Sequence, residues 1–340
     1  MTKTSVVLVT TTPDYPVDLG PVHEVLDPVA EVRTYPLPWR PATPEEAGAF
    51  TQALAEADAL FIRPGIITRA MVEGAPRLRV IAVHGSGVDQ VDVGAATGRG
   101  ILVTNAPAGP AISVAELTLA LMLRLVRPFQ QAADLVRQER WSEARLMGGE
   151  LCGRTLGLVG FGLIARLVAG RAAAFDMRIL ATDPYVAPEV IRAGGAEPRP
   201  LGTLLGEADF ISVHTPLLAE THHLIGEAEF AAMKPTAFFL NLSRGPVVDE
   251  SALVRALRER RIAGAAVDVL EEEPPRGRNP LFEIDTCLVT PHLGAATWPC
   301  LARTARYMAE DIARVLRGER PVNLVNPAAL GAAGGFQISD

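Results

Sequence analysis

The sequence predicts an α/β protein made of two doubly wound, parallel-sheet domains. Short β-branched runs alternate with Ala-rich amphipathic segments along most of its 340 residues, which is typical of parallel strands covered by helices. The chain is long enough for two ordinary domains. The pattern changes near Thr104, where the turn NAPAG and a helical stretch to about residue 137 separate two sets of strands.

Each set contains several buried strands. The first set comprises VVLV (6–9), ALFI (59–62), VIAV (80–83) and ILVT (101–104). The second set follows GGELCGRT and comprises TLGLVGFG, MRILATDPY, ADFISVHTP, AFFLNLSRG, GAAVDVL and CLVTPHLG. Right-handed crossovers between parallel strands make each sheet doubly wound. PVNLVNP near the carboxyl end indicates a segment tied to the first domain, before a Gly/Ala-rich tail.

Composition excludes several classes of protein. A net charge of −7 argues against a nucleic-acid surface, and three widely spaced cysteines form neither a disulfide framework nor a zinc pattern. We therefore predict no metal and a reducing, cytoplasmic location. The start of the chain lacks the pattern of a targeting segment. The most apolar stretch, residues 114–126, is shorter than a membrane span and contains Glu116 and Arg124, so we expect no membrane partner.

The stretch GLVGFGLIA (157–165) has the spacing of a dinucleotide-binding turn. Gly160 would permit a tight turn, Gly162 would let backbone approach a pyrophosphate, and Ala165 would let the helix pack closely on the strand. The alternative is a plain strand-to-helix turn. The next strand ends in Asp183 at about the 20-residue offset at which a carboxylate binds ribose hydroxyls. Asp183 favours NAD over NADP, although a turn aspartate would also fit there.

Three different reactive side chains follow three strands of the second set. These are Arg244, Glu273 and His292, and ligands of open parallel sheets bind outside the carboxyl ends of strands. Taken singly, each is more often structural or solvated. Together they predict an arginine that clamps a carboxylate, a histidine that carries a proton and a glutamate that orients the histidine. We expect the neighbouring Glu271 and Glu272 to be solvated.

The chain resembles the family of D-isomer-specific 2-hydroxyacid dehydrogenases over nearly its whole length. The motifs that carry the resemblance are GLVGFGLIA, ATDPY, ADFISVHTPLLAETHHLIGEAEFAAMKPTAFFLNLSRGPVVDESALVRAL, AAVDVLEEEPP and PHLGAAT. It implies a Rossmann NAD-binding domain at 105–294, inserted into a discontinuous, flavodoxin-like substrate domain at 1–104 and 295–330, with a tail at 331–340. It also leaves no room for the C-terminal regulatory domain of some phosphoglycerate dehydrogenases.

The resemblance implies roles for individual residues. Arg244, Glu273 and His292 would clamp the substrate, orient the imidazole and transfer the proton. Asp268 would face the nicotinamide amide, and His214, Thr215 and Pro216 would line the adenine side. The implied NAD-binding residues are Gly160, Gly162, Leu163, Ile164, Asp183, His214, Thr215, Pro216, Leu242, Ser243, Asp268 and Gly294.

On the substrate side, the resemblance implies that Ser86 and Gly87 in VHGSGVDQVDV bind the substrate carboxylate, although an ordinary Gly-rich loop would have the same sequence. Arg63 matches an arginine that holds a distal phosphate in phosphoglycerate dehydrogenases, but Pro64 and Gly65 replace small polar residues there. Pro110 stands where the family usually has Asn, which removes a donor near the nicotinamide.

The function that we predict is hydride transfer between NAD(H) and C2 of a D-2-hydroxy acid or 2-oxo acid, in a homodimer. Hydroxypyruvate, glyoxylate, phosphohydroxypyruvate and larger 2-oxo acids all stay open as substrates. One alternative is an NAD(H)-sensing, corepressor-like binding protein on the same fold. Another is a phosphite-type dehydrogenase. Formate oxidation is disfavoured, because formate enzymes of this family have glutamine where Glu273 stands.

Overall fold

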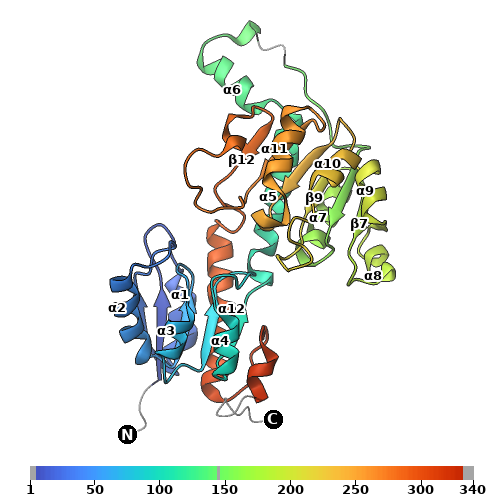
Figure 1. Cartoon of the computed structure of the whole chain (residues 1–340). Helices are drawn as coiled ribbons and strands as arrows, with labels where there is room; N and C mark the ends of the chain where they lie inside the picture. The colour runs from blue at the N-terminus through green and yellow to red at the C-terminus, as the bar shows by residue number, and fades with distance from the viewer. Residues whose placement is uncertain (1–4, 144–145, 332–340) are drawn as a thin grey trace. The chain divides into compact units, whose positions relative to one another are not determined.

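The computed structural model describes residues 5–143 and 146–331, and these fold into two compact units. The first unit comprises the chain up to Pro110 together with the chain from Ala295 onward, and the second comprises Ala111–Gly294. Figure 1 shows the elements coloured in chain order. Apart from Gly331, the predicted tail at 331–340 lies outside the described residues.

The first unit contains a five-stranded parallel sheet in the order β2-β1-β3-β4-β5. Alternate residues of its strands face opposite ways, so Val7 and Phe61 pack with α1 and α12, whereas Leu8 and Leu60 pack with α2, α3 and α4. The order is the flavodoxin-like one, with its switch point between β1 and β3. Its elements are β1 (Ser5–Thr10), α1 (Leu19–Leu26), β2 (Ala30–Tyr35), α2 (Pro44–Ala55), β3 (Ala59–Ile62), α3 (Arg69–Glu73), β4 (Val80–Val83), α4 (Val93–Gly98), β5 (Leu102–Asn105) and α12 (Trp298–Arg317).

The second unit contains a seven-stranded parallel sheet in the order β12-β11-β10-β9-β6-β7-β8. Reversed, this is the order of a Rossmann sheet with one added strand, and its switch point lies between β6 and β9. The prediction of two doubly wound parallel sheets is therefore confirmed. The elements are α5 (Ala108–Val126), α6 (Phe129–Arg137), β6 (Thr155–Val159), α7 (Leu163–Ala173), β7 (Arg178–Thr182), α8 (Pro188–Ala193), β8 (Glu197–Pro198), α9 (Leu201–Glu207), β9 (Phe210–Val213), α10 (Glu227–Ala232), β10 (Phe238–Asn241), α11 (Glu250–Arg258), β11 (Gly264–Val267) and β12 (Cys287–Val289).

Two strands were not predicted, and both lie at sheet edges. β2 has the sequence AEVRTY and only its first residue is buried, so it lacks the continuous apolar run of a central strand. β8 is two residues long. Edge strands are commonly short or charged, because such features discourage pairing with another chain. A search for runs of apolar residues therefore does not identify β2 and β8.

The long helical stretch after residue 105 is broken at Pro128 into α5 and α6, because proline removes a backbone donor from a continuing helix. The apolar stretch at 114–126, expected to be too short for a membrane span, is part of the longer helix α5. α5 has 19 residues and by length and composition could cross a bilayer. However, 61% of its most apolar window is buried in the structure, which is also a property of core helices.

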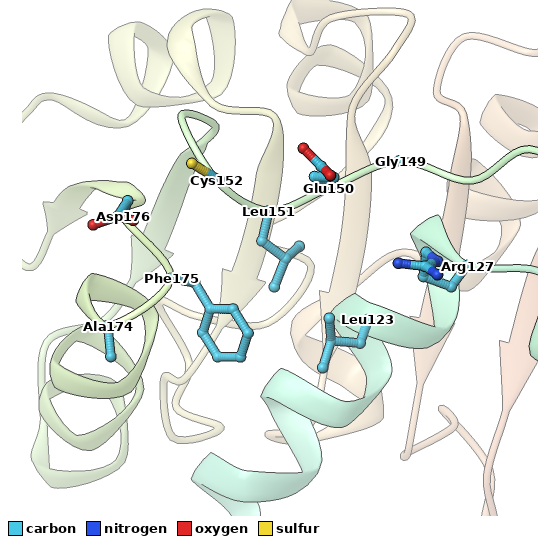
Figure 2. Close-up of a pocket in the computed structure, with 9 residues that line it drawn as sticks. All are labelled: Leu123, Arg127, Gly149, Glu150, Leu151, Cys152, Ala174, Phe175 and Asp176. Atoms are coloured by element: carbon cyan, nitrogen blue, oxygen red, sulfur yellow. The ribbon is translucent and has the colours of Figure 1, made fainter.

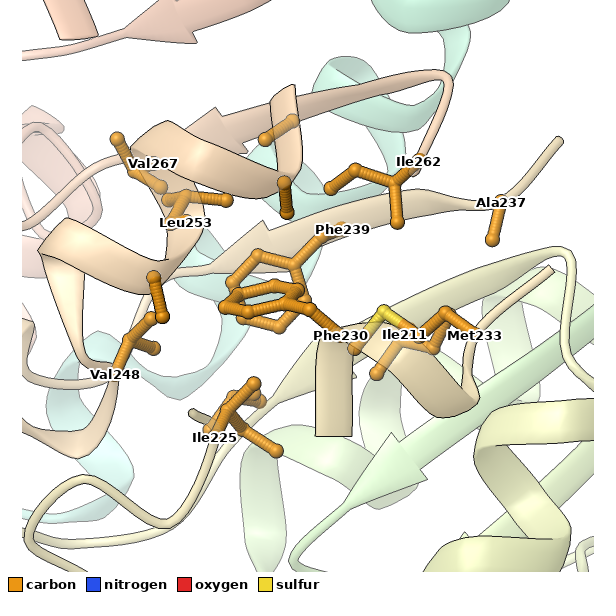
Figure 3. Close-up of a cluster of buried hydrophobic side chains, with 14 of the residues drawn as sticks. Ile211, Ile225, Phe230, Met233, Ala237, Phe239, Val248, Leu253, Ile262 and Val267 are labelled. Carbon is orange, nitrogen blue, oxygen red and sulfur yellow. The ribbon is translucent and has the colours of Figure 1, made fainter. Parts of the chain in front are cut away.

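The core beneath α10 and α11 gives β9, β10 and β11 a rigid base. Phe230 of α10 meets Phe239 of β10 edge-to-face, with 5.2 Å between ring centroids (Figure 3). Ile211 of β9, Leu253 of α11 and Val267 of β11 are buried in the same cluster. Interiors packed in this way resist displacement, so the carboxyl ends of these strands are fixed relative to one another.

Candidate active site

The turn after β6 has the geometry of a dinucleotide loop. Gly160 has φ +88°, and a Cβ there would lie 3.0 Å from the carbonyl carbon of His214, so both conformation and space require glycine. Gly162 is the N-cap residue of α7, and a Cβ on it would meet nothing within 4 Å. Ala165 is fully buried against the sheet. The first turn of α7 thus presents backbone N–H groups to open space, which suits a pyrophosphate.

Asp183 lies just after the carboxyl end of β7, and both of its carboxylate oxygens are engaged. Oδ2 accepts from the Phe161 N–H at 2.8 Å, and Oδ1 accepts from the Tyr185 N–H at 2.9 Å. The first bond ties Asp183 to the dinucleotide loop itself. Each carboxylate oxygen has a second lone pair, so Asp183 can still accept from a ribose hydroxyl. It also lines a pocket of about 560 Å³ with Tyr185 and Arg192.

Two buried polar atoms beside this loop have no partner among the described residues. They are Nδ1 of His214 and Oγ1 of Thr215, directly after β9. Burial lowers the pKa of His214 to about 4, so its ring is neutral, and its Nε2 lies 2.9 Å from the Ser212 hydroxyl. Unpaired buried polar atoms are rare and often mark a ligand. With the open space at Gly162 and the acid at Asp183, they fit a dinucleotide.

Arg244 follows β10 in a turn that is held from two sides. The Asn241 side-chain amide donates to the Arg244 carbonyl at 2.9 Å, while the Asn241 amide oxygen accepts from the Ser243 N–H at 3.0 Å and hydroxyl at 2.8 Å. A Cβ on Gly245 would lie 1.8 Å from the Leu270 carbonyl oxygen. The turn after β10 therefore packs directly on the backbone of the turn after β11.

Glu273 and His292 form a pair. Glu273 Oε2 lies 2.7 Å from His292 Nδ1, and Oε1 accepts from the Leu270 N–H at 2.8 Å. The Glu273 side chain is 28% exposed. Burial alone would raise the pKa of Glu273, but the hydrogen bond and charge of His292, the Leu270 N–H and the charge of Arg244 together hold it below its usual range. Glu273 is therefore a carboxylate at neutral pH.

The loop that carries His292 is held by Asp268. This carboxylate is 2% exposed and accepts from the Thr290 hydroxyl at 2.6 Å and from the N–H groups of Leu293 and Gly294, both at 2.7 Å. His292 itself has φ +53°, an uncommon conformation for a residue other than glycine. Asp268 thus holds the loop on both sides of His292, through the side chain of Thr290 before it and through the backbone of Leu293 and Gly294 after it.

The structure brings most of the predicted residues of the second unit to one edge of its sheet. Gly160, Asp183, His214 and Asp268 each directly follow a parallel strand, and Arg244 lies three residues after the end of β10. Leu163 and Ile164 begin α7, with Leu163 49% exposed. The remaining predicted residues, Thr215, Pro216, Leu242, Ser243, Glu273, His292 and Gly294, lie in the loops after β9, β10, β11 and β12.

Glu271 and Glu272 are exposed, as expected, but each has a partner. Glu272 pairs with Arg276, four residues later, at 2.7 Å. Glu271 Oε1 lies 2.6 Å from Nε2 of His223, a residue from another loop. The expectation that Glu271 is simply solvated was therefore incomplete.

In the first unit, Arg63 follows β3 at the switch point of the sheet. Its N–H donates to the Thr10 hydroxyl at 3.0 Å, its Nη1 lies 3.4 Å from His84 Nδ1, and its Nε is buried with no partner among the described residues. Burial lowers the pKa of Arg63. Burial and then the Arg63 charge lower the pKa of His84 to about 3, so His84 is neutral. A half-buried guanidinium with an unmatched donor suits an anion.

Ser86 and Gly87 lie in the loop after β4, also in the first unit. Gly85 has φ +150°, and its carbonyl accepts from the Ala106 N–H at 2.7 Å. The Ser86 carbonyl accepts from the Asn105 side-chain amide at 2.6 Å. Both bonds use carbonyl groups, and they attach the loop to the end of β5.

A second pocket in the unit that carries the dinucleotide loop contains none of the predicted residues. It has about 340 Å³ and is lined by Leu123, Cys152, Phe175 and neighbouring residues (Figure 2). Cys152 and Phe175 precede β6 and β7, so this pocket lies at the amino ends of the strands. Ligands of open parallel sheets bind at the opposite edge.

Residues that hold the reactive groups were missed by the sequence analysis. Asn241, Gly245 and Thr290 contact the backbone or the carboxylates that position Arg244 and His292. The role of Asn241 could have been predicted from the sequence, because the side chain of an asparagine at a strand end commonly hydrogen-bonds to the backbone two or three residues later. Thr290 and Gly245 act across long sequence separations, which local patterns do not show.

Comparison with known proteins agrees with this geometry. Residues 119–294 match the family described as D-isomer specific 2-hydroxyacid dehydrogenase, NAD binding domain. The chain is 39% identical to a glyoxylate reductase of Thermococcus litoralis over 300 residues, which cover 86% of this chain and 90% of the relative. It is 42% identical to a D-3-phosphoglycerate dehydrogenase of Methanocaldococcus jannaschii over 312 residues, 90% of this chain but 58% of that protein.

Solved structures show the same fold over almost the whole chain. A protein from Thermus thermophilus has a TM-score of 0.81 at 35% identity, covering 94% of this chain and 99% of its own. An NADPH-dependent glyoxylate/hydroxypyruvate reductase from Sinorhizobium meliloti, in complex with NADP and malonate, has a TM-score of 0.82 at 26% identity, covering 99% and 100%. The chain belongs to the D-isomer specific 2-hydroxyacid dehydrogenase family.

We predict that Gly245→Ala lowers kcat about tenfold or more, because the new methyl group forces the Arg244 turn away from the Leu270–Glu273 turn. Gly170→Ala is the matched control, since a Cβ on this exposed helical glycine meets nothing within 4 Å, and alanine favours helix. Steady-state kinetics and thermal unfolding of both variants check the prediction. Wild-type turnover in Gly245→Ala would show that the two turns need not touch.

Proposed function

We propose that this protein is an NAD-dependent oxidoreductase that interconverts a D-2-hydroxy acid and the corresponding 2-oxo acid. The observation that carries the proposal is the His292–Glu273 pair at 2.7 Å, held on the same sheet edge as the dinucleotide loop and beside the Arg244 turn. The relatives named above support the reaction class. The chain spans only 58% of the phosphoglycerate dehydrogenase that it matches, so similarity to that relative alone does not identify the substrate of this protein.

The chain's own residues supply binding and proton transfer. A bound nicotinamide supplies or accepts the hydride. His292 uses Nδ1 toward Glu273, so Nε2 is the atom that gives a proton to the carbonyl oxygen in reduction and takes it back in oxidation. The Glu273 carboxylate stabilises the protonated ring and sets its orientation. The Arg244 guanidinium, whose planar shape suits a carboxylate, is the group that we propose to bind the substrate carboxylate.

We propose NAD rather than NADP as the cofactor. Asp183 lies where it can accept hydrogen bonds from ribose hydroxyls, and its negative charge opposes a 2′-phosphate. Arg199 lines the same pocket, but it already pairs with Glu197 at 2.7 Å and lies 3.5 Å from Glu207. The charge of Arg199 is thus largely matched within the protein.

For the substrate, we propose a small 2-oxo acid that carries a second anionic or polar group, bound by Arg63. The buried, unpartnered Nε of Arg63 and the neutral His84 beside it support this assignment. Ser86 and Gly87 are proposed to contact the substrate carboxylate. Glyoxylate lacks a distal group and phosphohydroxypyruvate has a charged one, so together they test the role of Arg63.

We also propose that the protein is a homodimer through its second unit. α6 has no buried residue, and apolar side chains on and after it are exposed, with Phe129 at 54%, Val136 at 48% and Trp141 at 76%. Exposed apolar clusters of this kind often mark protein–protein contacts.

We expect His292→Asn to lower kcat for 2-oxo acid reduction by about 10²–10⁴-fold, because the group that delivers the proton is removed. NADH binding, followed by fluorescence titration, is expected to stay close to wild type. Turnover is measured as NADH consumption. A variant that keeps most of its turnover would exclude His292 as the proton carrier.

Glu273→Gln is expected to lower kcat for 2-oxo acid reduction by roughly tenfold or more, measured as NADH consumption at several pH values. Glu273 is a carboxylate at neutral pH, because its pKa lies below the usual range. The neutral amide cannot supply that charge and holds the His292 ring less firmly than the carboxylate does. Identical rate profiles for variant and wild type would contradict the pairing.

Arg63→Gln is expected to raise KM for phosphohydroxypyruvate more than about tenfold while leaving glyoxylate kinetics nearly unchanged, because only the former has a distal charge to lose. A panel of 2-oxo acids with NADH and NADPH gives both comparisons. Equal effects on the two substrates would remove Arg63 from distal-group binding.

A further inference from the structure

A second histidine–glutamate pair lies next to the first in the same unit. The loop after β9 runs beside the segment that follows Arg244. The His223 N–H donates to the Pro246 carbonyl at 2.8 Å, the Ile225 N–H donates to the Val247 carbonyl at 3.2 Å, and the Asp249 N–H donates to the Ile225 carbonyl at 2.9 Å. The loop that begins with His214 is thus joined by its backbone to the Arg244 turn.

The His223 ring extends this connection to the turn after β11. His223 has φ +52°, and its Nε2 lies 2.6 Å from Glu271 Oε1. The His222 ring stacks on it, with centroids 4.0 Å apart. On the other side, the Glu271 N–H donates to Glu250 Oε2 at 3.1 Å. Glu271 is two residues before Glu273, so the pair is attached to the short turn that carries the Glu273 carboxylate.

An exposed ion pair ordinarily contributes little to stability, and both partners here are partly exposed, at 41% for His223 and 35% for Glu271. The His223–Glu271 pair differs from an ordinary exposed ion pair in its location. It connects three loops, those after β9, β10 and β11, that hold the predicted dinucleotide and reactive residues. A left-handed backbone at a histidine is also uncommon and is often found at functional positions.

We propose that His223 is a positioning residue, which through Glu271 holds the Leu270–Glu273 turn against the loop of the predicted adenine side and so fixes the Glu273 carboxylate for His292. The proposal rests on the proposed function. Without the ring contact, the turn keeps its contact with Gly245 and its bond to Glu250, so the fold is expected to survive. The Glu273 carboxylate then spends less time in line with His292 Nδ1, and proton transfer slows.

The test is a double-mutant cycle with His223→Asn and Glu271→Ala. Asparagine tolerates a positive φ but does not reach as far as the ring, so the backbone is not strained. Each single variant is expected to lower kcat roughly two- to tenfold, with KM for the 2-oxo acid and the Kd of NADH near wild type. The double variant should be no slower than the slower single variant, because both remove one interaction.

A rescue variant and a control variant distinguish a positioning role of His223 from a general loss of stability. Glu271→Gln keeps an acceptor for the imidazole and should recover most of the lost kcat. His23→Asn is the matched control, since His23 forms a similar exposed pair with Asp27 at 2.9 Å on α1 of the first unit, and it should leave kcat unchanged. Thermal unfolding is followed for every variant.

The proposal is overturned if the single variants have wild-type kcat, if their losses multiply in the double variant, or if kcat falls only in parallel with a lowered Tm. A rise in KM with unchanged kcat would also overturn it. Failure of the proposed function is a separate result, because wild-type protein would then fail to oxidise NADH with any 2-oxo acid.

Discussion

The hydrogen bond between Glu273 and His292 is the interaction on which the proposed chemistry depends. A carboxylate held below its usual pKa lies 2.7 Å from Nδ1 of the imidazole, so the ring has a defined orientation and its Nε2 is available to a substrate. Each partner is held in place by hydrogen bonds to neighbouring residues. The Leu270 N–H holds Glu273, and the buried Asp268 carboxylate holds the residues on either side of His292.

The architecture makes this arrangement possible with few contacts. Parallel strands all end at one edge, so five strands bring the predicted dinucleotide loop, Asp183, His214, Arg244 and Asp268 to that edge in short loops. Gly245 also packs closely on the Leu270 carbonyl, so the loops after β10 and β11 are in direct contact. Arg63, in the first unit, is proposed to contribute to substrate specificity, because function depends on particular side chains more than on the shared fold.

The sequence alone predicted the two parallel sheets, the dinucleotide turn and the strand ends that bear Arg244 and Asp183, because central strands are continuous apolar runs and glycine spacing is local. It did not predict β2 or β8, whose edge positions leave them polar or short. It also missed the part of Asp268 in holding the His292 loop and the pairing of His223 with Glu271. Both link residues more than 20 positions apart, and their partners have no distinctive local pattern.

The most direct test of the central claim is the ¹⁵N chemical shift of the His292 ring nitrogens across neutral pH, recorded in wild-type protein and in Glu273→Gln. If Glu273 accepts a hydrogen bond from Nδ1, the neutral ring of the wild type carries its proton on Nδ1 and leaves Nε2 bare. In the variant the preference for this tautomer is weaker. A neutral wild-type ring without a proton on Nδ1, or the same tautomer populations in both proteins, would contradict the account.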